Sequence, residues 1–321
     1  MVESGKLDAD DRRVLHALQL DPRASFARIG TVLGLSERTV SRRYHRLRSQ
    51  LILRIVGHEQ TGRADWLLQI MTAPAAVDAV SRALAARRDT SWIAHLAGTG
   101  GLSCILRTTA TAGDALEQLR RMPGIGSVTA QRLLAPVAGV GGWPGRLQAL
   151  TPEEQRALIE PERRAPSVSG TGRLPTDEPL LSMLAADGRM SIARLARGSG
   201  MPESTVRRRI SELTARGVLM FEVEVDPKLY GRGTDVLCWL TVRPAAVRAV
   251  SEALNAHSEV AFAATTTGDS NVMAILELTD SEALHHYLAD SIGALAGVER
   301  VRTEIVSDWI KRAGPLPMLR R

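Results

Sequence analysis

Hydrophobic residues in the first 50 positions recur with helical spacing and are interrupted at two short turns. The apolar positions of the first two predicted helices are Val14, Leu15 and Leu18, followed by Phe26, Ile29 and Leu33. Ser25 and Ser36 precede the second and third predicted helices, and serine is a favoured N-cap residue. Gly34 breaks the pattern before the third helix, which should run to about Gln50. Three helices with a short glycine-containing turn predict a helix-turn-helix.

Much of this pattern recurs 166 residues later in the chain. The segment Asp21-Pro-Arg23-Ala-Ser25 returns as Asp187-Gly-Arg189-Met-Ser191. The same offset relates Val14, Leu15 and Leu18 to Leu180, Leu181 and Leu184, and Thr39, Val40, Arg42, Arg43 and Leu47 to Thr205, Val206, Arg208, Arg209 and Leu213. A repeat of this length is too long for a solenoid unit. The sequence therefore predicts a duplicated domain pair with two helix-turn-helix segments.

Each predicted helix-turn-helix is followed by strand-like sequence. Over residues 221–226, apolar Phe, Val and Val alternate with Glu, Glu and Asp, which predicts a half-buried strand. Both halves then continue in the order strand, helix, strand, strand, helix, strand. The predicted ranges are 66–72, 75–87, 91–97, 102–108, 112–121 and 127–134 in the first half, and 236–242, 245–256, 260–267, 271–278, 281–295 and 298–307 in the second. This order is that of the ferredoxin-like fold, an antiparallel sheet with helices on one face.

The predicted fold class is α+β, with two tandem units. Each unit is expected to hold a winged-type helix-turn-helix domain followed by a ferredoxin-like βαββαβ domain. The expected boundaries are 1–60 and 61–137 for the first unit, 138–173 for a linker, and 174–227 and 228–321 for the second unit. Within the linker, the sequence Thr151-Pro-Glu-Glu154 has the form of a capping box, which predicts a short helix through Leu158.

The third helix of each predicted helix-turn-helix carries the candidate DNA contacts. On a helical wheel, Val40, Tyr44 and Leu47 share the core face, while Arg38 and Arg42 fall on the opposite side. The expected DNA-binding residues are Arg38, Thr39, Ser41, Arg42 and Arg43 in the first helix, and Ser204, Thr205, Arg207, Arg208 and Arg209 in the second. An arginine at such a position can bond a guanine in the major groove. Arg43 and Arg209 lie on the flank, where either a phosphate or an acidic neighbour is within reach.

Composition is compatible with this interpretation. The net charge is +6, which favours a polyanionic partner without demanding one. The two cysteines, Cys104 and Cys238, lie in apolar runs and are expected to be buried thiols. The first twenty residues are rich in Asp and Arg, and no apolar run is long enough to span a membrane. We therefore expect a cytoplasmic protein without a membrane partner.

In combination, these motifs resemble those of the Lrp/AsnC (feast/famine) family of transcriptional regulators. The matching elements are Leu7-Asp8 with Asp11, Asp21-Pro-Arg23-Ala-Ser25, Gly34-Leu35-Ser36 and Thr39-Val40-Ser-Arg-Arg43, and in the second unit Asp177, Asp187-Gly-Arg189-Met-Ser191, Gly200-Met201, Thr205-Val206-Arg-Arg-Arg209 and Gly217-Val218-Leu219. The resemblance implies a transcriptional regulator that binds an imperfect palindrome in double-stranded DNA, responds to an amino acid or related metabolite, and forms a homo-oligomer.

The sequence departs from the family pattern at several positions. Pro202 replaces the expected capping serine and predicts a different start for the second recognition helix, and Leu51 replaces a glycine that would end the first. The family's Gly-Asp turn, implicated in effector binding, corresponds to Gly268, Asp269, Ser270 and Asn271. The equivalent turn at 98–101 has no acidic side chain. The resemblance therefore predicts an effector site mainly at the second turn, although Asp269 is equally compatible with a simple turn-forming role.

An enzyme is the alternative interpretation. Siroheme decarboxylases resemble this family in both domains and would need basic or aromatic groups converging on an acidic tetrapyrrole. His257, His285 and His286 are the candidates, but the last two are adjacent and point to different helix faces. No metal-spaced His/Cys set and no phosphate-binding loop occurs in the sequence. We therefore expect a regulator without catalytic activity, cofactor or metal.

Overall fold

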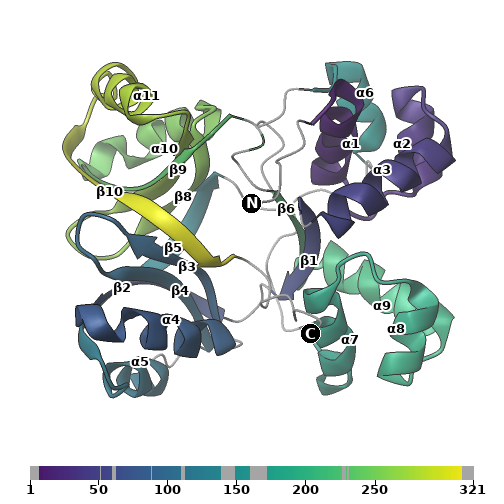
Figure 1. Ribbon diagram of the computed structural model, residues 1–321, viewed down its shortest axis with the longest axis horizontal. Coiled ribbons are helices and arrows are strands. Elements are labelled where there is room, and N and C mark those ends of the chain that lie inside the picture. Colours follow the sequence, from purple (N-terminus) through teal and green to yellow (C-terminus); the bar gives the residue numbers. More distant parts are fainter. Residues whose placement is uncertain are drawn as a thin grey trace. The chain divides into compact units, whose positions relative to one another are not determined.

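The chain folds into two compact units, each of which draws on both halves of the sequence. The computed structural model describes residues 7–50, 52–59, 63–87, 89–109, 113–138, 149–159, 172–225, 229 and 231–312. One unit contains residues 1–61 and 144–230, and the other contains residues 62–143 and 231–321 (Figure 1). Among the described residues, no helix is long and apolar enough to cross a membrane.

The first unit contains two three-helix groups, which we call head 1 and head 2. Head 1 consists of α1 (Ala9–Leu20), α2 (Phe26–Leu33) and α3 (Glu37–Ser49), and head 2 of α7 (Glu178–Ala186), α8 (Ile192–Ser199) and α9 (Glu203–Ala215), with a 3₁₀ turn at Pro175–Asp177 before α7. The predicted caps are confirmed, because the Ser25 and Ser36 side chains accept hydrogen bonds from backbone N–H groups of the helices that follow. Gly34 (φ 69°) and Gly200 (φ 72°) end α2 and α8 in the left-handed region, which glycine adopts without steric cost.

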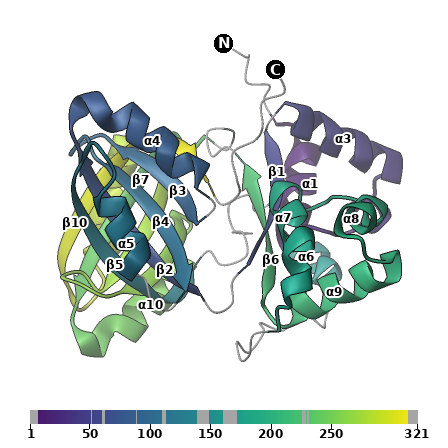
Figure 2. The ribbon, with the colours of Figure 1, turned by 90° about the horizontal axis from the view of Figure 1, so that it is seen from below.

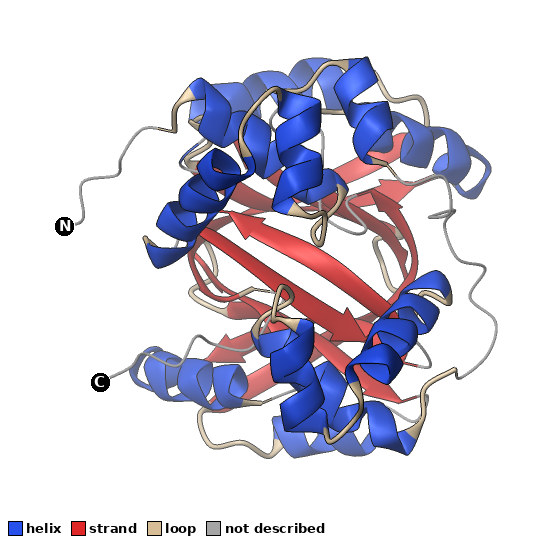
Figure 3. Cartoon of the chain, turned by 90° about the vertical axis from the view of Figure 1, so that its right-hand side faces the viewer, coloured by secondary structure: helices blue, strands red, loops and turns tan. Residues whose placement is uncertain are grey.

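The two heads are joined by a two-stranded antiparallel ribbon. Strand β1 (Leu53–Glu59) follows head 1 and pairs with β6 (Leu219–Val225), which follows head 2. Val56 lies opposite Glu222, its counterpart at the 166-residue offset, so the register is symmetric about this pair. Figure 3 shows helices on either side of the ribbon. Val223 and Val225 of β6 belong to the core of head 1, whereas Phe221 belongs to the core of head 2.

The helix predicted within the linker is confirmed as α6 (Pro152–Leu158). Thr151 and Glu154 form the expected capping box. Leu150 and Leu158 are buried in the core of head 1, and Arg13 of α1 forms an ion pair with Glu154 at 2.6 Å. Residues 139–148 and 160–171 of the predicted linker lie outside the described residues.

One prediction about head 2 is wrong. Helix α9 begins at Glu203, the counterpart of Glu37 at the start of α3, although Pro202 replaces the capping serine. Pro202 makes no side-chain capping bond, so only that bond is lost. The extended backbone of Pro202 (φ −58°, ψ 148°) suffices to start the helix at the same place. Leu51 lies outside the described residues.

The second unit is a closed eight-stranded barrel with helices on its outer surface. The first half contributes β2 (Arg63–Thr72), β3 (Thr90–Leu96), β4 (Leu102–Thr109), β5 (Ile125–Ala138), α4 (Val77–Ala86) and α5 (Gly113–Arg120), and the second half contributes β7 (Thr234–Val242), β8 (Val260–Thr266), β9 (Val272–Leu278), β10 (Val298–Lys311), α10 (Val247–Ala256) and α11 (Ser281–His286), with 3₁₀ turns at Pro74–Ala76 and Pro244–Ala246. The strand order is β10-β3-β4-β2-β5-β8-β9-β7, and β7 pairs with β10 to close the circle. The halves meet at the antiparallel seams β5–β8 and β10–β3.

Alternation along the strands divides the barrel into an inside and an outside. Leu67, Leu237 and Trp239 face the interior, which is filled with apolar side chains. The neighbouring positions Leu68 and Cys238 face outward and are covered by α4 and α5 or by α10 and α11. Figure 2 shows α4, α5 and α10 on the outer surface of the barrel. The structure therefore has the predicted α+β class, and its helices and strands follow one another in the predicted order.

Three elements end several residues away from the predicted positions. Strands β5 and β10 run to Ala138 and Lys311, beyond the expected ends at 134 and 307, because their last residues form the seams. The final helix is shorter than expected, since it passes into a π-helical turn over Tyr287–Ile292 that ends at Gly293. Cys104 and Cys238 are buried as predicted, and burial raises the pKa of each thiol to about 12.

The barrel interior should contribute strongly to stability. Trp239 is 1% exposed, and its Nε1 donates a hydrogen bond to Gln131 Oε1 at 3.1 Å across the two halves. We expect Trp239→Ala to lower the free energy of unfolding by about 3–5 kcal/mol, because it leaves a cavity and removes that bond. Val301→Ala on β10, at a side chain that is 39% exposed, should change it by less than about 0.5 kcal/mol. Chemical denaturation checks both values, and equal losses would contradict the assignment of Trp239 to the interior.

Candidate nucleic-acid interface

Helices α3 and α9 are held by the same kind of core face. Val40, Tyr44 and Leu47 of α3 are buried in head 1. Val206, Ile210 and Leu213 of α9 are buried at the corresponding places in head 2. The predicted core faces are therefore confirmed, and the opposite face of each helix is left for contact with a partner.

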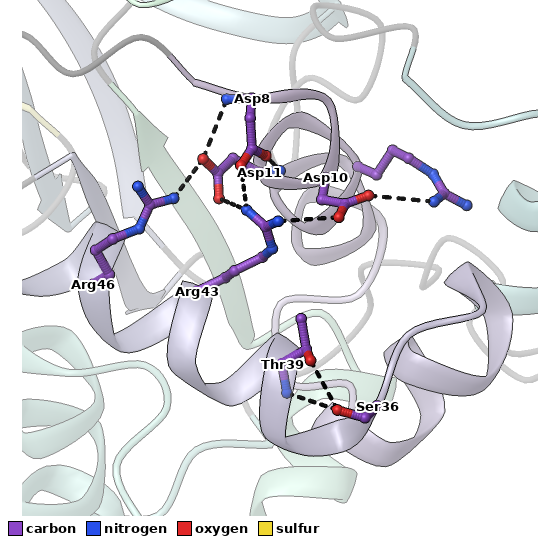
Figure 4. Close-up of polar contacts among 8 residues, drawn as sticks. Asp8, Asp10, Asp11, Ser36, Thr39, Arg43 and Arg46 are labelled. Carbon is purple, nitrogen blue, oxygen red and sulfur yellow. Dashed lines mark hydrogen bonds and ion pairs between the residues drawn. The ribbon is translucent and has the colours of Figure 1, made fainter.

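The outer face of α3 carries a cluster of unneutralised arginine charge. Arg38 and Arg42 are exposed, and neither forms an ion pair or hydrogen bond with any residue that the structure describes. Thr39 and Ser41 lie beside them and are half-buried. The Thr39 hydroxyl also lies 2.8 Å from Ser36 Oγ, within the cap of the helix (Figure 4). These two arginines, near the start of the helix, can therefore bind an anionic ligand without first breaking an ion pair within the described part of the protein.

The outer face of α9 is partly neutralised by its own carboxylates. Ser204, Arg207 and Arg208 are exposed, and Thr205 is half-buried. Arg207 pairs with Glu203 at 3.4 Å, and Arg208 pairs with Glu212 at 2.8 Å. Exposed pairs of this kind contribute only about 0.3–0.5 kcal/mol, so both arginines remain available to a phosphate or base. Overall, α3 has five arginines and one glutamate, whereas α9 has three arginines and two glutamates.

Arg43 is held inside head 1 by acidic residues of α1. Its guanidinium bonds Asp8 at 2.6 Å, Asp11 at 2.8 Å and Asp10 at 3.0 Å (Figure 4). Burial opposes the charged form of Arg43, but the hydrogen bonds that Arg43 donates to Asp8 and Asp11 outweigh it and raise the pKa of Arg43. Of the two partners that the sequence allowed, the structure shows the acidic neighbour.

Arg209 is held in the same way in head 2. It bonds Asp177, which is fully buried, through Nε at 3.0 Å and through Nη2, and it bonds Glu212 at 2.7 Å. Hydrogen bonding to Asp177 raises the pKa of Arg209. Burial opposes ionisation of Asp177, but the hydrogen bonds from Arg209 and the Leu174 N–H outweigh it and lower the pKa of Asp177 below 3.8. Arg43 and Arg209 thus connect each recognition helix to its own head.

The candidate effector turn lies at the end of β8 in the barrel. Gly268 has φ 104°, and the Asn271 side chain bonds both the N–H (2.9 Å) and the C=O (2.7 Å) of Val242. The backbone oxygens of Asp269 and Ser270 accept hydrogen bonds from the Thr241 and Thr266 hydroxyls. These contacts give Asn271 and the backbone a structural role. The Asp269 side chain is exposed.

The sequence did not indicate a carboxylate at the other turn, but the structure places one there. A Cβ on Gly98 would lie 2.9 Å from Oε2 of Glu304, which belongs to β10 in the second half of the chain. The Glu304 side chain is 11% exposed, and Arg302 lies 3.8 Å from it. No local pattern could have shown this contact, because it depends on the seam between β10 and β3.

The candidate catalytic histidines do not converge. His257 is bonded to the Tyr287 hydroxyl at 2.9 Å, while His286 is exposed beside Glu282 and Asp290. His285 lies next to His286 on α11, with ring centroids 5.6 Å apart. Among the described residues, no group of three or more His, Cys, Asp or Glu side chains could hold a metal ion.

The fold and the two exposed helix faces define a helix-turn-helix protein. Family models match at residues 7–48 (AsnC-type helix-turn-helix domain), 173–220 (winged helix-turn-helix DNA-binding) and 235–316 (Lrp/AsnC ligand binding domain). An uncharacterised HTH-type transcriptional regulator of Pyrococcus furiosus is 30% identical over 139 residues, which cover 43% of this chain and 93% of that protein. The HTH-type transcriptional regulator FL11 of Pyrococcus horikoshii is 29% identical, over 46% of this chain and 99% of its own length. The chain belongs to the Lrp/AsnC family.

Two solved structures of one enzyme are similar over nearly the whole chain. The siroheme decarboxylase NirDL aligns with a TM-score of 0.65 over 94% of this chain and 92% of its own, at 13% sequence identity. The same enzyme in complex with an iron-uroporphyrin III analogue aligns with a TM-score of 0.65 at 14% identity. At this identity the likeness concerns the fold alone.

The neighbouring residues Arg208 and Arg209 should differ sharply in their effect on stability. We expect Arg209→Ala to lower the free energy of unfolding by about 3–5 kcal/mol, because Asp177 would be left buried without its partner. Arg208→Ala, at a side chain that is 65% exposed, should cost less than about 1 kcal/mol.

Chemical denaturation at neutral pH measures both losses. Because the folded pKa of Asp177 is lowered, the contribution of the pair is present above pH 3.8 and is lost as the pH falls through the lowered value. Similar losses for the two variants at neutral pH would show that Arg209 is not an internal anchor.

Proposed function

We propose that this protein is a sequence-specific DNA-binding transcriptional regulator whose two heads are tandem copies of one unit. The observation that carries the proposal is the ribbon of β1 and β6. It joins the two helix-turn-helix heads, and its register is symmetric about the pair Val56 and Glu222. A pair of heads related in this way within one chain corresponds to the dimer that reads a palindrome. The family of the chain and the names of its relatives support the same role.

The proposed DNA contacts are the outward side chains of the recognition helices. In head 1 they are Arg38, Thr39, Ser41 and Arg42, and in head 2 Ser204, Thr205, Arg207 and Arg208. Arg43 and Arg209 are proposed to anchor α3 and α9 within their own heads and not to contact DNA. Two half-sites about one helical turn apart, or a multiple of it, fit such a pair of heads.

The two half-sites should be unequal. Arg38 has a serine counterpart at Ser204, and the arginines of α9 share their charge with Glu203 and Glu212. Head 1 should therefore read its half-site more stringently, and the complete site should be an imperfect palindrome.

Arg42 is the residue that should distinguish specific from random DNA. We expect Arg42→Ala to weaken binding to the specific site by about 1–3 kcal/mol, because a bond to a base edge is lost, and to affect random DNA much less. Arg208→Ala should have a smaller effect on the same site, since Arg208 must first release Glu212. Fluorescence anisotropy with labelled duplexes measures these affinities. An equal loss on specific and random DNA would instead assign Arg42 to a phosphate.

A small-molecule effector, an amino acid or a related metabolite, is proposed to bind at the barrel. The Asp269 carboxylate is exposed at a turn that backbone and Asn271 contacts keep in place. It can therefore pair with an ammonium group without reorganisation of the turn. A coupling of about 1–3 kcal/mol between effector and DNA binding is typical of such sensors. Chains are further proposed to associate as homo-oligomers.

The effector site is tested by two carboxylate variants. Each of the twenty amino acids is screened by thermal shift, and the affinity of those that stabilise the protein is measured by calorimetry. We expect Asp269→Ala to weaken binding at least tenfold, which corresponds to about 1.4 kcal/mol. Glu304→Gln at the other turn should have a smaller effect. Unchanged affinity in Asp269→Ala would contradict this site, and a dominant effect of Glu304→Gln would move it to the turn at 98–101.

The likeness to siroheme decarboxylase favours one second candidate, an enzyme acting on an acidic tetrapyrrole. That enzyme shares the fold of this chain, with a TM-score of 0.65 over 94% of the chain. Against it, His286 lies beside two carboxylates, which would repel an acidic substrate. Incubation of the protein with siroheme separates the two candidates. A shifted visible spectrum followed by loss of carboxylate groups would support the enzyme, and an unchanged spectrum would support the regulator.

A further inference from the structure

The repeated Asp-x-Arg segments lie against each other in the first unit. Residues 21–25 connect α1 to α2 in head 1, and residues 187–191 connect α7 to α8 in head 2. Arg189 donates from Nη1 to the Pro22 oxygen at 2.8 Å and from Nη2 to the Ala24 oxygen at 2.9 Å. In return, Arg23 donates from Nη1 to the Gly188 oxygen. Each arginine therefore crosses to the backbone of the other head.

Arg189 also contacts the recognition helix of head 1. Its guanidinium carbon lies 4.6 Å from the ring centroid of Phe26 and 5.2 Å from that of Tyr44. Tyr44 belongs to the core face of α3 and is 3% exposed. Burial lowers the pKa of Arg189. A cation over aromatic rings is held more strongly when it is withdrawn from water, so this contact fixes head 2 against α3.

The reciprocal ring contact of Arg23 is with β6. The guanidinium carbon of Arg23 lies 5.4 Å from the ring centroid of Phe221. The counterparts of Phe26 and Tyr44 at the 166-residue offset are Ile192 and Ile210, which offer no aromatic face. The two arginines of the repeat are therefore chemically unequal, and Arg23 serves as an internal control for Arg189.

Two more contacts join the heads at the same place. Arg48, at the end of α3, bonds Asp187 at 2.6 Å. The Gly188 N–H donates to the Ile55 oxygen at 2.7 Å, and a Cβ on Gly188 would lie 3.1 Å from that oxygen. Glycine thus allows a close backbone approach that a larger residue would obstruct. We call the contacts of Arg23, Arg48, Asp187, Gly188 and Arg189 the cross-head clasp.

We infer that the cross-head clasp sets the spacing between the half-sites that this chain accepts, with Arg189 as its main positioning residue. The inference rests on the proposed DNA-binding function. Apart from the clasp, the heads are joined through the seven-residue ribbon of β1 and β6. Two-stranded ribbons twist more than wider sheets, so the pairing of β1 with β6 does not by itself define the rotation between the heads. The bonds of Arg23, Arg48 and Arg189 lie outside the ribbon, so they restrict the distance and rotation between α3 and α9.

A DNA-free measurement tests the clasp directly. Spin labels are placed at Ser49→Cys and Ala215→Cys, exposed positions at the ends of α3 and α9 that the 166-residue offset relates. The native thiols are buried, with pKa values of about 12, and should resist labelling. Pulsed electron resonance should give one narrow distance distribution for the otherwise wild-type protein. Arg189→Ala should broaden it, Arg23→Ala should broaden it less, and Arg189→Lys should partly restore it.

Binding to spaced half-sites provides the functional readout. The half-sites are obtained by selection from random DNA and separated by the preferred spacer or by one or two base pairs more or fewer. The wild type should prefer one spacer strongly. In Arg189→Ala, this preference should fall by about tenfold, because the heads can adjust to other spacers. Affinity for an isolated head 1 half-site should not change, because Arg189 contacts no DNA.

The outcomes separate the two proposals. An unchanged distance distribution and an unchanged spacer preference in Arg189→Ala would overturn the clasp while leaving DNA binding intact. An equal loss on the isolated half-site would also overturn it, since Arg189 would then act on the folding of head 1. Should Arg189→Ala not fold, Arg48→Met, which removes the bond to Asp187 from a side chain that is 46% exposed, takes its place with the same expected directions. A broadened distribution together with no sequence preference in the wild type would support the clasp and overturn the proposed function.

Discussion

The antiparallel pairing of β1 with β6 is the constraint on which the organisation of the heads depends. Its register is fixed by burial, because Val223 and Val225 pack into head 1 while Phe221 packs into head 2. A slip of one residue would turn Glu222 and Glu224 toward these cores, which no local adjustment could accommodate. The same register places Val56 opposite Glu222, so the two heads are related symmetrically and their Asp-x-Arg loops meet.

The barrel follows the same principle of pairing between the halves of the chain. The seams β5–β8 and β10–β3 leave no strand edge open, which removes sites for unwanted strand addition. Trp239 and Gln131 bond across the halves, and Glu304 of one half lies at the turn of the other. Both units therefore need both halves of the sequence. One chain therefore supplies both heads and all eight strands of the barrel.

Local chemistry made much of this structure predictable from the sequence. Serine caps at Ser25 and Ser36, the capping box at Thr151 and the core face of α3 all depend on residues a few positions apart. Pro202 led to a wrong prediction, because the backbone of a proline can start a helix without a capping side chain. For Arg43 the sequence left a phosphate and an acidic neighbour open, and the partners of Arg189 and Glu304 were beyond prediction, since they are set by how distant segments dock. Arg42 and Arg43 are neighbours in the sequence, yet only Arg43 is bound to Asp8, Asp10 and Asp11.

Selection of bound sequences from random duplex DNA by the full chain tests the central claim most directly. We predict a motif of two parts at one fixed spacing, with related but unequal half-sites and the sharper preference at the half-site of head 1. Binding should be far tighter than to random DNA and should weaken with salt, as expected for contacts by arginines such as Arg38 and Arg42. A motif with a single part, or no enrichment at all, would contradict the account, because the two heads would not read DNA as a pair.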